Sequence, residues 1–355
     1  MPAVIHVEER AVIDTPQYLP AVSIVLPFKP MMSSKSELES KLKRAVKKVE
    51  LQLMDNYTVD KALPVLLKLN FLIQNINYNT HKKSIAIFIS PVTEKVYYLD
   101  IDVDERIVID ESFKIRDLIH SKKQNIDYLI LMLSAEKSKM YLANDSKFTL
   151  IKSNVPVDIN SETLDEEHNK EKLLDKFLHS MDDDLQLIIT AYKLPVFVVA
   201  TEQVISHFKK ITKNAEKIVG FIQMENMEAT ELEMYQILQR YIQDWKKVKQ
   251  QALLQEIGMA VDYEKVAFGI EDVWESAMHT HSKLLVIEKD FICTASISAI
   301  ADTISRVNIN AGNPFYIKDA VDNVIEKVLQ NGGDVEFIEN DMLKDYGRIA
   351  LIREY

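Results

Sequence analysis

Glycine is scarce in this sequence of 355 residues and is confined to its second part. Only seven glycines occur, and the first 219 residues contain none. Phosphate-binding loops need glycines where backbone N–H groups approach a nucleotide closely, and a nucleophile elbow needs them around its serine. The first 219 residues therefore exclude both motifs. The later glycines lack the spacing of a Walker-type or dinucleotide-binding loop.

Cysteines and long apolar runs are also missing. The single cysteine, Cys293, excludes an internal disulfide and a multi-cysteine zinc site. No apolar run is long enough to cross a bilayer, and Glu8-Glu9-Arg10 stands where a signal peptide would need an apolar core. We therefore expect a cytoplasmic protein without a membrane segment. His279 and His281 lack further ligands, so neither a metal nor a small-molecule cofactor is predicted.

The charge of the chain is acidic and unevenly distributed. The formal net charge is −11 at pH 7, and residues 260–355 hold 17 acidic residues against 9 basic ones. A nucleic-acid binder needs a basic surface to contact phosphates. The composition therefore argues against a generic nucleic-acid binder and favours a protein partner for the last third of the chain.

The spacing of apolar residues predicts an α/β protein with three α/β domains, at residues 1–123, 124–259 and 260–355. The first domain is mixed, with strands at 21–26, 84–90, 96–100 and 106–110 and helices between and after them. The central domain has strands at 128–132, 139–142, 148–151, 195–199 and 218–222. The last domain alternates helices with apolar strands such as 284–288, which predicts a three-layer α/β/α sandwich.

Three local predictions in these domains concern polar or short segments. Residues Ser153–Asn169 are polar and acidic and are predicted to form a long loop. Helices are predicted at Lys170–Ser180 and Leu185–Lys193, with the acidic residues 182–184 between them as an N-cap for the second helix. Ser298–Ser305 is predicted to form a helix.

The strongest helix signal lies at residues 231–257. Thr230 and Glu233 have the spacing of a capping box, and Gly258 stands where a C-cap glycine is expected. Apolar residues recur along the helix at spacings of three and four. We expect this seam to pack on the protein's own sheet, with a homodimer through the 231–257 helix as the alternative.

The helix predicted at Ser36–Met54 has a basic face. Apolar residues recur on one side, and the other side carries Lys41, Lys43, Arg44, Lys47 and Lys48. A solvated helix face explains such a pattern, and an RNA-binding surface is the functional alternative. Lys41, Arg44, Lys47 and Lys48 are therefore the candidate RNA-facing residues.

Two segments in the last third resemble the third domain of the archaeo-eukaryotic class 1 peptide-chain release factors and of Pelota. The first is Phe268-Gly269-Ile270-Glu271-Asp272, followed by the strand Leu285-Val286-Ile287. The second is Gly332-Gly333-Asp334, Val335-Glu336-Phe337 and the closing run from Gly347 to Tyr355. The resemblance covers about 90 residues and implies an RNase H-like central domain. The whole chain resembles the bacterial branch of release-factor-like proteins.

The resemblance implies a partner-docking role for the acidic third domain, with Glu271, Asp272, Asp345 and Tyr346 as candidate docking residues. Release factors act through Gly-Gly-Gln on a loop of the central domain. The equivalent loop in this chain, Ser153–Asn169, has neither glycine nor glutamine. No catalytic residue can therefore be assigned from the family.

Three functions remain as hypotheses. The first is a non-catalytic adaptor associated with the ribosome or with a translation protein. The second is a hydrolase acting on peptidyl-tRNA or RNA through a different loop, with the carboxylates of residues 182–184 or of the 153–169 segment as the first suspects. The third is a protein-interaction scaffold outside translation, because a fold does not fix a function.

Overall fold

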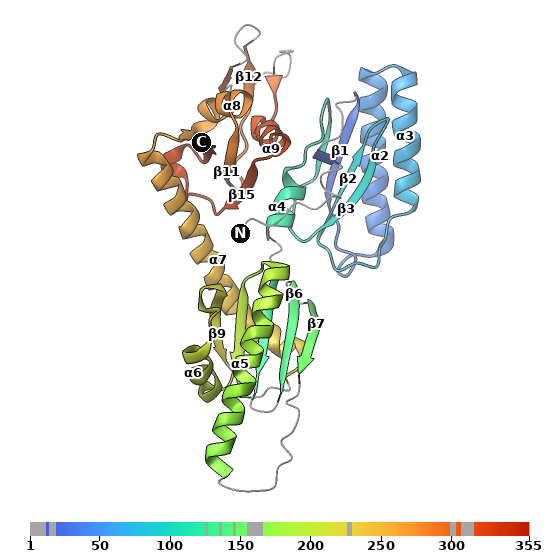
Figure 1. The fold of residues 1–355 in the computed structure, drawn as a ribbon. Helices are drawn as coiled ribbons and strands as arrows, with labels where there is room; N and C mark the ends of the chain where they lie inside the picture. Colours follow the sequence, from blue (N-terminus) through green and yellow to red (C-terminus); the bar gives the residue numbers. More distant parts are fainter. Residues whose placement is uncertain are drawn as a thin grey trace. The chain divides into compact units, whose positions relative to one another are not determined.

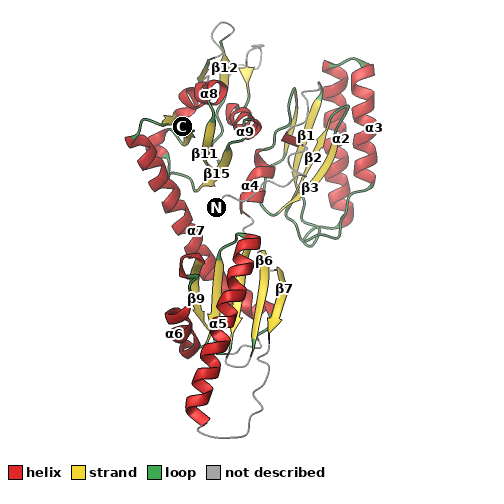
Figure 2. Ribbon diagram, viewed as in Figure 1, coloured by secondary structure: helices red, strands yellow, loops and turns green. Residues whose placement is uncertain are grey.

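The computed structural model of the chain describes residues 12–13, 19–124, 127–134, 137–144, 147–154, 166–225, 229–298, 303–306 and 316–354. The chain divides into two units (Figure 1). The smaller unit comprises residues 125–252, and the larger unit joins residues 2–124 with residues 253–355. Each unit combines helices with β-sheets, which confirms the predicted α/β class (Figure 2). None of the helices in these ranges is long and apolar enough to cross a membrane.

The N-terminal part of the larger unit is a four-stranded antiparallel sheet in the order β3-β2-β1-β4. Its elements are β1 (Ala21–Pro27), α2 (Lys35–Asn56), α3 (Val59–Gln74), β2 (Ser84–Ile89), β3 (Glu94–Leu99), β4 (Arg106–Asp110) and α4 (Arg116–Gln124). Successive side chains of a strand point to opposite faces. Val22 and Ile24 of β1 therefore pack under α2 and α3, whereas Ala21 and Val25 join the core that contains α4.

The smaller unit contains a five-stranded sheet in the order β7-β6-β5-β8-β9. Strands β5, β6 and β7 are antiparallel neighbours, and β5, β8 and β9 are parallel neighbours. This is the RNase H-like arrangement expected for the central domain. The elements are β5 (Asp127–Leu133), β6 (Ser138–Asn144), β7 (Lys147–Asn154), α5 (Glu166–Tyr192), β8 (Val196–Ala200), α6 (Glu202–Ile211), η1 (Ala215–Lys217) and β9 (Ile218–Gln223). Helices α5 and α6 cover one face of the sheet, and helix α7 (Glu231–Asp262) covers the other.

The C-terminal part of the larger unit has a sheet in the order β10-β16-β11-β15. Its elements are β10 (Val266–Phe268), α8 (Gly269–His279), β11 (Ser282–Glu288), α9 (Ala320–Gln330), β15 (Asp334–Ile338), η2 (Lys344–Tyr346) and β16 (Ile349–Arg353). A small sheet is added by β12 (Ala295–Ile297), β13 (Ile304–Arg306) and β14 (Tyr316–Ile317). Helices α8 and α9 pack on one face of the main sheet, and the last turns of α7 pack on the other. The predicted three layers are therefore present.

Helix α7 confirms the predicted capping box but not the predicted end. The carboxylate of Glu233 accepts hydrogen bonds from the backbone N–H of Thr230 at 2.8 Å and from its hydroxyl at 2.9 Å. Gly258 lies inside the helix, so its assignment as a C-cap was wrong. Chain reversal comes later, where Glu264 has a φ of 56°. Met234 and Leu238 of the apolar seam are buried against the protein's own sheet, as expected.

Two other sequence predictions are corrected by the structure. The helices predicted at 170–180 and 185–193 are one continuous helix, α5, which begins at Glu166 inside the predicted loop. Residues 155–165 of that loop lie outside the described residues. In the segment predicted as a helix at 298–305, Ile304 and Ser305 instead belong to strand β13. Pairing with β12 accounts for this, because Ser296 lies opposite Ser305 in the ladder.

The two parts of the larger unit share one hydrophobic core. Ala86, Phe88, Leu118 and Ile119 of the N-terminal part belong to the same cluster of buried residues as α8, α9 and β11 of the C-terminal part. Burial of apolar surface is the main favourable contribution to such packing. The predicted boundaries at 123 and 259 lie close to the ends of the smaller unit. The division of the larger unit into two separate domains stays a prediction.

Candidate partner-docking and RNA-facing surfaces

Two segments that are far apart in the sequence meet at an aromatic pair in the C-terminal part. Strand β10 pairs with β16 in an antiparallel register, with Phe268 opposite Ala350. This pairing brings the ring of Phe268 onto the ring of Tyr346, with centroids 4.7 Å apart and planes inclined by 25°. Offset aromatic stacking at this distance adds to the stabilisation from buried area. The stack places the predicted docking residue Tyr346 beside the N-terminus of α8.

The first turn of α8 supplies a charged group to the same place. Glu271 forms an ion pair with Arg306 of β13, with 3.1 Å between Oε1 and Nε. Arg306 also lies near both Gly269 and Gly347. We call Phe268, Glu271, Arg306 and Tyr346 the aromatic–acidic patch. The structure thus brings together two of the four predicted docking residues, Glu271 and Tyr346. Asp272 and Asp345 are their exposed sequence neighbours.

Gly269 and Gly347 allow this close approach. Both have positive φ angles, 70° and 66°. A Cβ atom added at Gly347 would lie 2.9 Å from the Cα atom of Gly269, which is shorter than real Cβ contacts. A side chain at Gly347 would therefore push apart the segments that carry Phe268 and Tyr346, whereas at Gly269 only the positive φ angle disfavours a side chain. Gly269 and Gly347, two of the four glycines in the segments that carry the resemblance, thus have a structural role in forming the patch.

Replacing Gly347 with alanine is expected to lower the free energy of unfolding by about 1–3 kcal/mol, because a left-handed conformation and a close contact are both strained. Chemical denaturation followed by circular dichroism measures the change. Gly258→Ala is the matched control, since Gly258 lies inside α7 and a Cβ atom added there would meet no other atom within 4 Å. Alanine should be neutral or stabilising there. Equal stability of the two variants would contradict the strain at Gly347.

A buried carboxylate fixes the loop that carries Tyr346. Glu288, at the end of β11, is fully buried, and its carboxylate accepts hydrogen bonds from Arg348 Nε at 2.6 Å and from the Leu343 N–H at 2.9 Å. Burial alone would raise the pKa of Glu288. The hydrogen bonds from Arg348, Leu343 and Asp341 outweigh that effect and lower the pKa. Glu288 is therefore ionised at neutral pH and holds the turn before β16 in place.

The candidate RNA-facing residues divide into two groups on α2. Lys41 pairs with Glu37 at 3.1 Å, and Lys48 pairs with Glu105 before β4. Lys43, Arg44 and Lys47 are exposed, and within the described ranges no acidic side chain forms an ion pair with them. Together with Ser36, Glu39 and Ser40 they line a shallow hollow on the outer side of the helix. Arg44, Lys47 and the neighbouring Lys43 are therefore the residues of this face that remain available to a partner.

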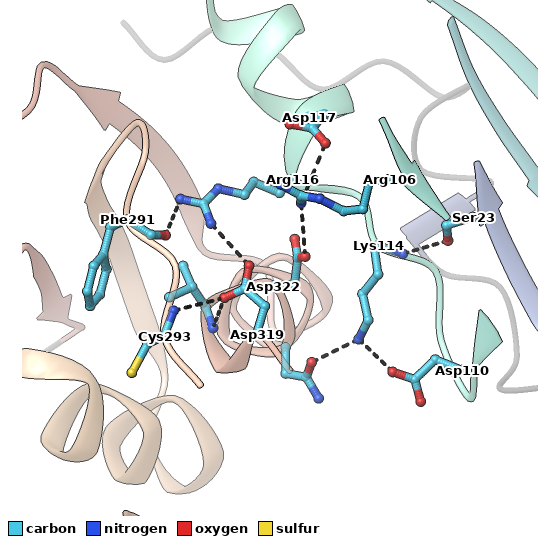
Figure 3. A network of polar contacts seen from close by, with 12 residues as sticks. Ser23, Arg106, Asp110, Lys114, Arg116, Asp117, Phe291, Cys293, Asp319 and Asp322 are labelled. Atoms are coloured by element: carbon cyan, nitrogen blue, oxygen red, sulfur yellow. Dashed lines mark hydrogen bonds and ion pairs between the residues drawn. The ribbon is translucent and has the colours of Figure 1, made fainter. Parts of the chain in front are cut away.

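A network of buried polar groups, which the sequence did not indicate, joins the two parts of the larger unit (Figure 3). Arg116 of α4 is 3% exposed and forms an ion pair with Asp319 at 3.2 Å. Its guanidinium also donates to the backbone carbonyls of Lys289, at 3.3 Å, and Phe291. Asp319 is the N-cap of α9 and accepts from the Val321 N–H at 3.1 Å.

Other residues of the N-terminal part extend this network. Arg106 lies 3.6 Å from Asp117 and 3.7 Å from the buried Asp322. Lys114 donates to Asn323 at 3.0 Å, and Lys123 pairs with Asp334 at 2.6 Å and with Glu336 at 3.4 Å. Four acidic residues of the last third thus contact basic residues of the chain's own N-terminal part. The acidic excess that suggested an external partner is therefore used in part inside the molecule.

The acidic residues 182–184 do not form a common site. They lie within α5 and point to different partners, so their assignment as a helix N-cap was wrong. Asp182 is buried and accepts from Thr212, Lys213 and Asn214. Asp183 approaches Lys213 at 3.7 Å, and Asp184 pairs with Lys152 at 2.7 Å. Among the described residues, no group of three or more His, Cys, Asp or Glu side chains could hold a metal ion.

A histidine–carboxylate pair in the smaller unit has no counterpart in the sequence analysis. His207 of α6 lies 2.9 Å from Asp175 of α5, beside a shallow hollow lined by Glu202, Gln203, Ser206, Lys210 and Glu225. Ser206 precedes His207 directly, and adjacent residues of a helix do not face each other. The pair therefore ties α6 to α5 and does not form a nucleophilic triad.

The comparison with protein families finds a match in the middle of the chain. Residues 127–280 match the family described as bacterial archaeo-eukaryotic release factor family 3. The match covers the RNase H-like sheet, α7 and the segment that carries Phe268 and Glu271. The matched segment is thus similar to a release factor family, in agreement with the resemblance of the last third of the chain. A search of curated proteins found no match.

Several solved structures match the chain at low identity and with low TM-scores. Archaeal Pelota, in a model of ribosome-bound archaeal Pelota and ABCE1, is 12% identical with a TM-score of 0.45, over 77% of each chain. S. cerevisiae Dom34, a translation termination-like factor that interacts with Hbs1, is 13% identical with a TM-score of 0.40, over 78% of this chain and 74% of that chain. The archaeal translation termination factor aRF1 is 12% identical with a TM-score of 0.25, over 98% of this chain and 97% of that chain. Likenesses of this size do not assign an activity.

Proposed function

We propose that this chain is a translation-associated adaptor that binds the ribosome, or a protein acting on it, without catalysing a reaction. The match of residues 127–280 to a release factor family carries the proposal. The sequence contains no Gly-Gly-Gln, and its residues 155–165 contain neither glycine nor glutamine. This supports an adaptor over a hydrolase. A ribosomal partner would place the protein in the cytoplasm.

The two surfaces fit different parts of this role. Lys43, Arg44 and Lys47 offer positive charge to the phosphates of ribosomal RNA, and they do so from a single helix face. The aromatic–acidic patch offers a protein partner two stacked rings beside a carboxylate and a guanidinium. Aromatic and arginine side chains carry much of the binding energy at protein interfaces. We therefore assign RNA contact to α2 and protein docking to the patch.

Neutralising the basic residues of α2 is expected to weaken ribosome binding. The variant Lys43→Gln/Arg44→Gln/Lys47→Gln should lower the affinity for purified ribosomes roughly tenfold or more, and should reduce the salt dependence of binding by about three phosphate contacts. Co-sedimentation with ribosomes at a series of salt concentrations measures both. The matched control is Lys95→Gln/Lys172→Gln/Lys176→Gln, which removes the same charge from positions elsewhere in the chain.

Two results would contradict the proposal. One is equal loss of binding in the α2 variant and in the control, since only net charge would then matter. The other is absence of the wild-type chain from ribosomal fractions of a sucrose gradient, under both growth and stress conditions. A chain that hydrolyses peptidyl-tRNA would refute the non-catalytic part of the proposal alone.

A further inference from the structure

The loop that carries Tyr346 has a strained backbone. We call residues 339–348, between β15 and β16, the docking loop. Within it, Asp341 and Arg348 have positive φ angles of 67° and 70°, and the adjacent Gly347 has one of 66°. Residues other than glycine rarely adopt this left-handed conformation, and they keep it only where surrounding contacts hold it. The conformation of the docking loop, and with it the position of Tyr346, therefore depends on the contacts that hold the loop.

The turn at the end of β11 holds the docking loop. It comprises residues 288–291, and the Phe291 N–H donates to the Glu288 carbonyl at 3.0 Å. Each of its four residues contacts the loop: Glu288 contacts Leu343 and Arg348, Lys289 contacts Glu339, Asp290 contacts Asn340, and Phe291 contacts Arg348. In the last contact, the Arg348 guanidinium lies over the Phe291 ring, 5.1 Å from its centroid. A displacement of the 288–291 turn would therefore remove the contacts that hold the strained loop.

Arg116 of α4 binds the same turn from the N-terminal part, as Figure 3 shows for Phe291. Its guanidinium donates to the backbone carbonyls of Lys289, at 3.3 Å, and of Phe291. The ion pair with Asp319, at 3.2 Å, fixes the guanidinium in this position. A planar guanidinium donates to several acceptors in a fixed geometry, which the ammonium group of a lysine does not reproduce. The position of α4 therefore sets the position of the 288–291 turn.

We infer that the N-terminal part controls the docking loop through Arg116 and the 288–291 turn. Helix α4 packs on one face of the N-terminal sheet and α2 on the other. A change in the N-terminal part that displaces α4 would release the turn, and the strained loop would then move Tyr346 away from Phe268. Coupling between two sites is reciprocal, so a partner that holds the loop at the aromatic–acidic patch also holds α4. The role of the loop in docking rests on the proposed function, whereas the coupling rests on the contacts alone.

Hydrogen–deuterium exchange of the full chain, measured on its peptides by mass spectrometry, tests the coupling without a partner or a ribosome. Arg116→Lys keeps the positive charge beside Asp319 but does not donate to both carbonyls of the turn in the geometry of the guanidinium. We expect the amides of the docking loop to exchange at least about fivefold faster in this variant. Unchanged exchange in strand β11 shows that the fold is intact. Lys114→Gln is the matched control, because Lys114 also joins the two parts, through Asn323 of α9 and not through the turn.

A second variant, Arg348→Gln, perturbs the same contacts from the side of the loop, and it decides the matter if Arg116→Lys does not fold. The Arg348 side chain is 41% exposed, so this variant is expected to fold. Exchange should become faster in the docking loop and, because coupling is reciprocal, in α4 as well. Lys344→Gln is its control, since Lys344 is an exposed residue of the same loop, and it should leave α4 unchanged.

Three results would overturn the inference. They are unchanged exchange of the docking loop in Arg116→Lys, equally faster exchange in Lys114→Gln, and an effect of Arg348→Gln that does not extend to α4. Loss of ribosome co-sedimentation would refute the proposed function and would leave the coupling unaffected.

Discussion

Replacing Arg116 with methionine is expected to lower the free energy of unfolding of the larger unit by about 3–5 kcal/mol, as removal of one partner of a buried ion pair does. The guanidinium is 3% exposed and is bound to Asp319 and to two backbone carbonyls. Methionine fills much of the same volume but donates no hydrogen bond. The largely buried charge of Asp319 would remain without its main partner, and the carbonyls of Lys289 and Phe291 would lose their donor.

Urea denaturation followed by circular dichroism measures this effect. Arg44→Met is the matched control, since it makes the same substitution at an exposed position of the same unit. Its stability should stay within about 0.5 kcal/mol of the wild type. If the two units unfold in separate transitions, only that of the larger unit should shift. Equal effects of the two substitutions would show that Arg116 does not hold the two parts of the larger unit together.

The helices and strands of this protein could be predicted where buried apolar residues recur at a regular spacing along the sequence. Strand β1 is buried along nearly its whole length, and its apolar run predicted it within one residue. The buried residues Leu38, Leu42, Ala45 and Val49 of α2 recur at spacings of three and four. The side of the helix that faces the core could therefore be predicted as well. The capping box of α7 was recognisable because both of its partners lie within three residues of each other.

The elements that were predicted wrongly are those whose boundaries depend on contacts with residues far away in the sequence. Three consecutive aspartates suggested a helix boundary. Asp182 nevertheless lies inside α5, where its carboxylate accepts hydrogen bonds from Thr212 and Asn214, which follow α6. Gly258 is unfavourable in a helix by only about 1 kcal/mol relative to alanine. Packing of Ile257 and Leu254 on the C-terminal sheet outweighs that cost. Local propensity could not reveal either contact.

The docking role of the candidate residues stays a prediction, and their geometry could not be predicted from the sequence. Glu271 and Tyr346 were selected by resemblance, and their proximity results from the pairing of β10 with β16. The network around Arg116 gave no signal, because its partners lie 173 to 203 positions away in the chain. An excess of acidic residues in the last third was visible. The sequence did not reveal that Asp322, Asp334 and Glu336 contact basic residues of the chain's own N-terminal part.

Asp322 and His120 give this interface opposite dependences on pH. Asp322 is buried, and one of its carboxylate oxygens has no hydrogen-bond partner among the described residues. Burial and the neighbouring Asp319 raise its pKa from 3.8 to about 7, although Arg116, Lys114 and Arg106 oppose the shift. Burial also lowers the pKa of His120, to about 4, and its ring packs against Phe337 with centroids 4.7 Å apart and planes inclined by 40°. In the folded protein Asp322 is therefore protonated and neutral below about pH 7, and His120 is deprotonated and neutral above about pH 4.

The signs of the two contributions follow from proton binding. Between about pH 4 and 7 the folded state keeps the proton on Asp322 while the unfolded state has lost it, so stability falls as pH rises. Between about pH 4 and 6.5 the unfolded state protonates the histidine while the folded state does not, so stability rises with pH. The two slopes oppose each other over most of this range. Removing one of them should expose the other.

Replacing Asp322 with asparagine should therefore make the chain more stable relative to the wild type as pH rises from about 5 to 7. The difference in unfolding free energy between variant and wild type should grow by roughly 1.4 kcal/mol per pH unit at its steepest and level off above about pH 7. A pH-independent effect of the asparagine on the unfolding free energy does not matter, because only the change of the difference with pH is compared. Urea denaturation at a series of pH values from about 5 to 8 provides the measurement.

Asp183→Asn serves as the control, because the Asp183 side chain is 74% exposed. Its stability difference from the wild type should stay nearly constant over the same range. A difference for Asp322→Asn that is equally flat would mean that Asp322 is ionised in the folded protein. The expected increase instead assigns a neutral carboxyl to this position, where α9 packs against the N-terminal part, and it explains why one of its oxygens can lack a partner.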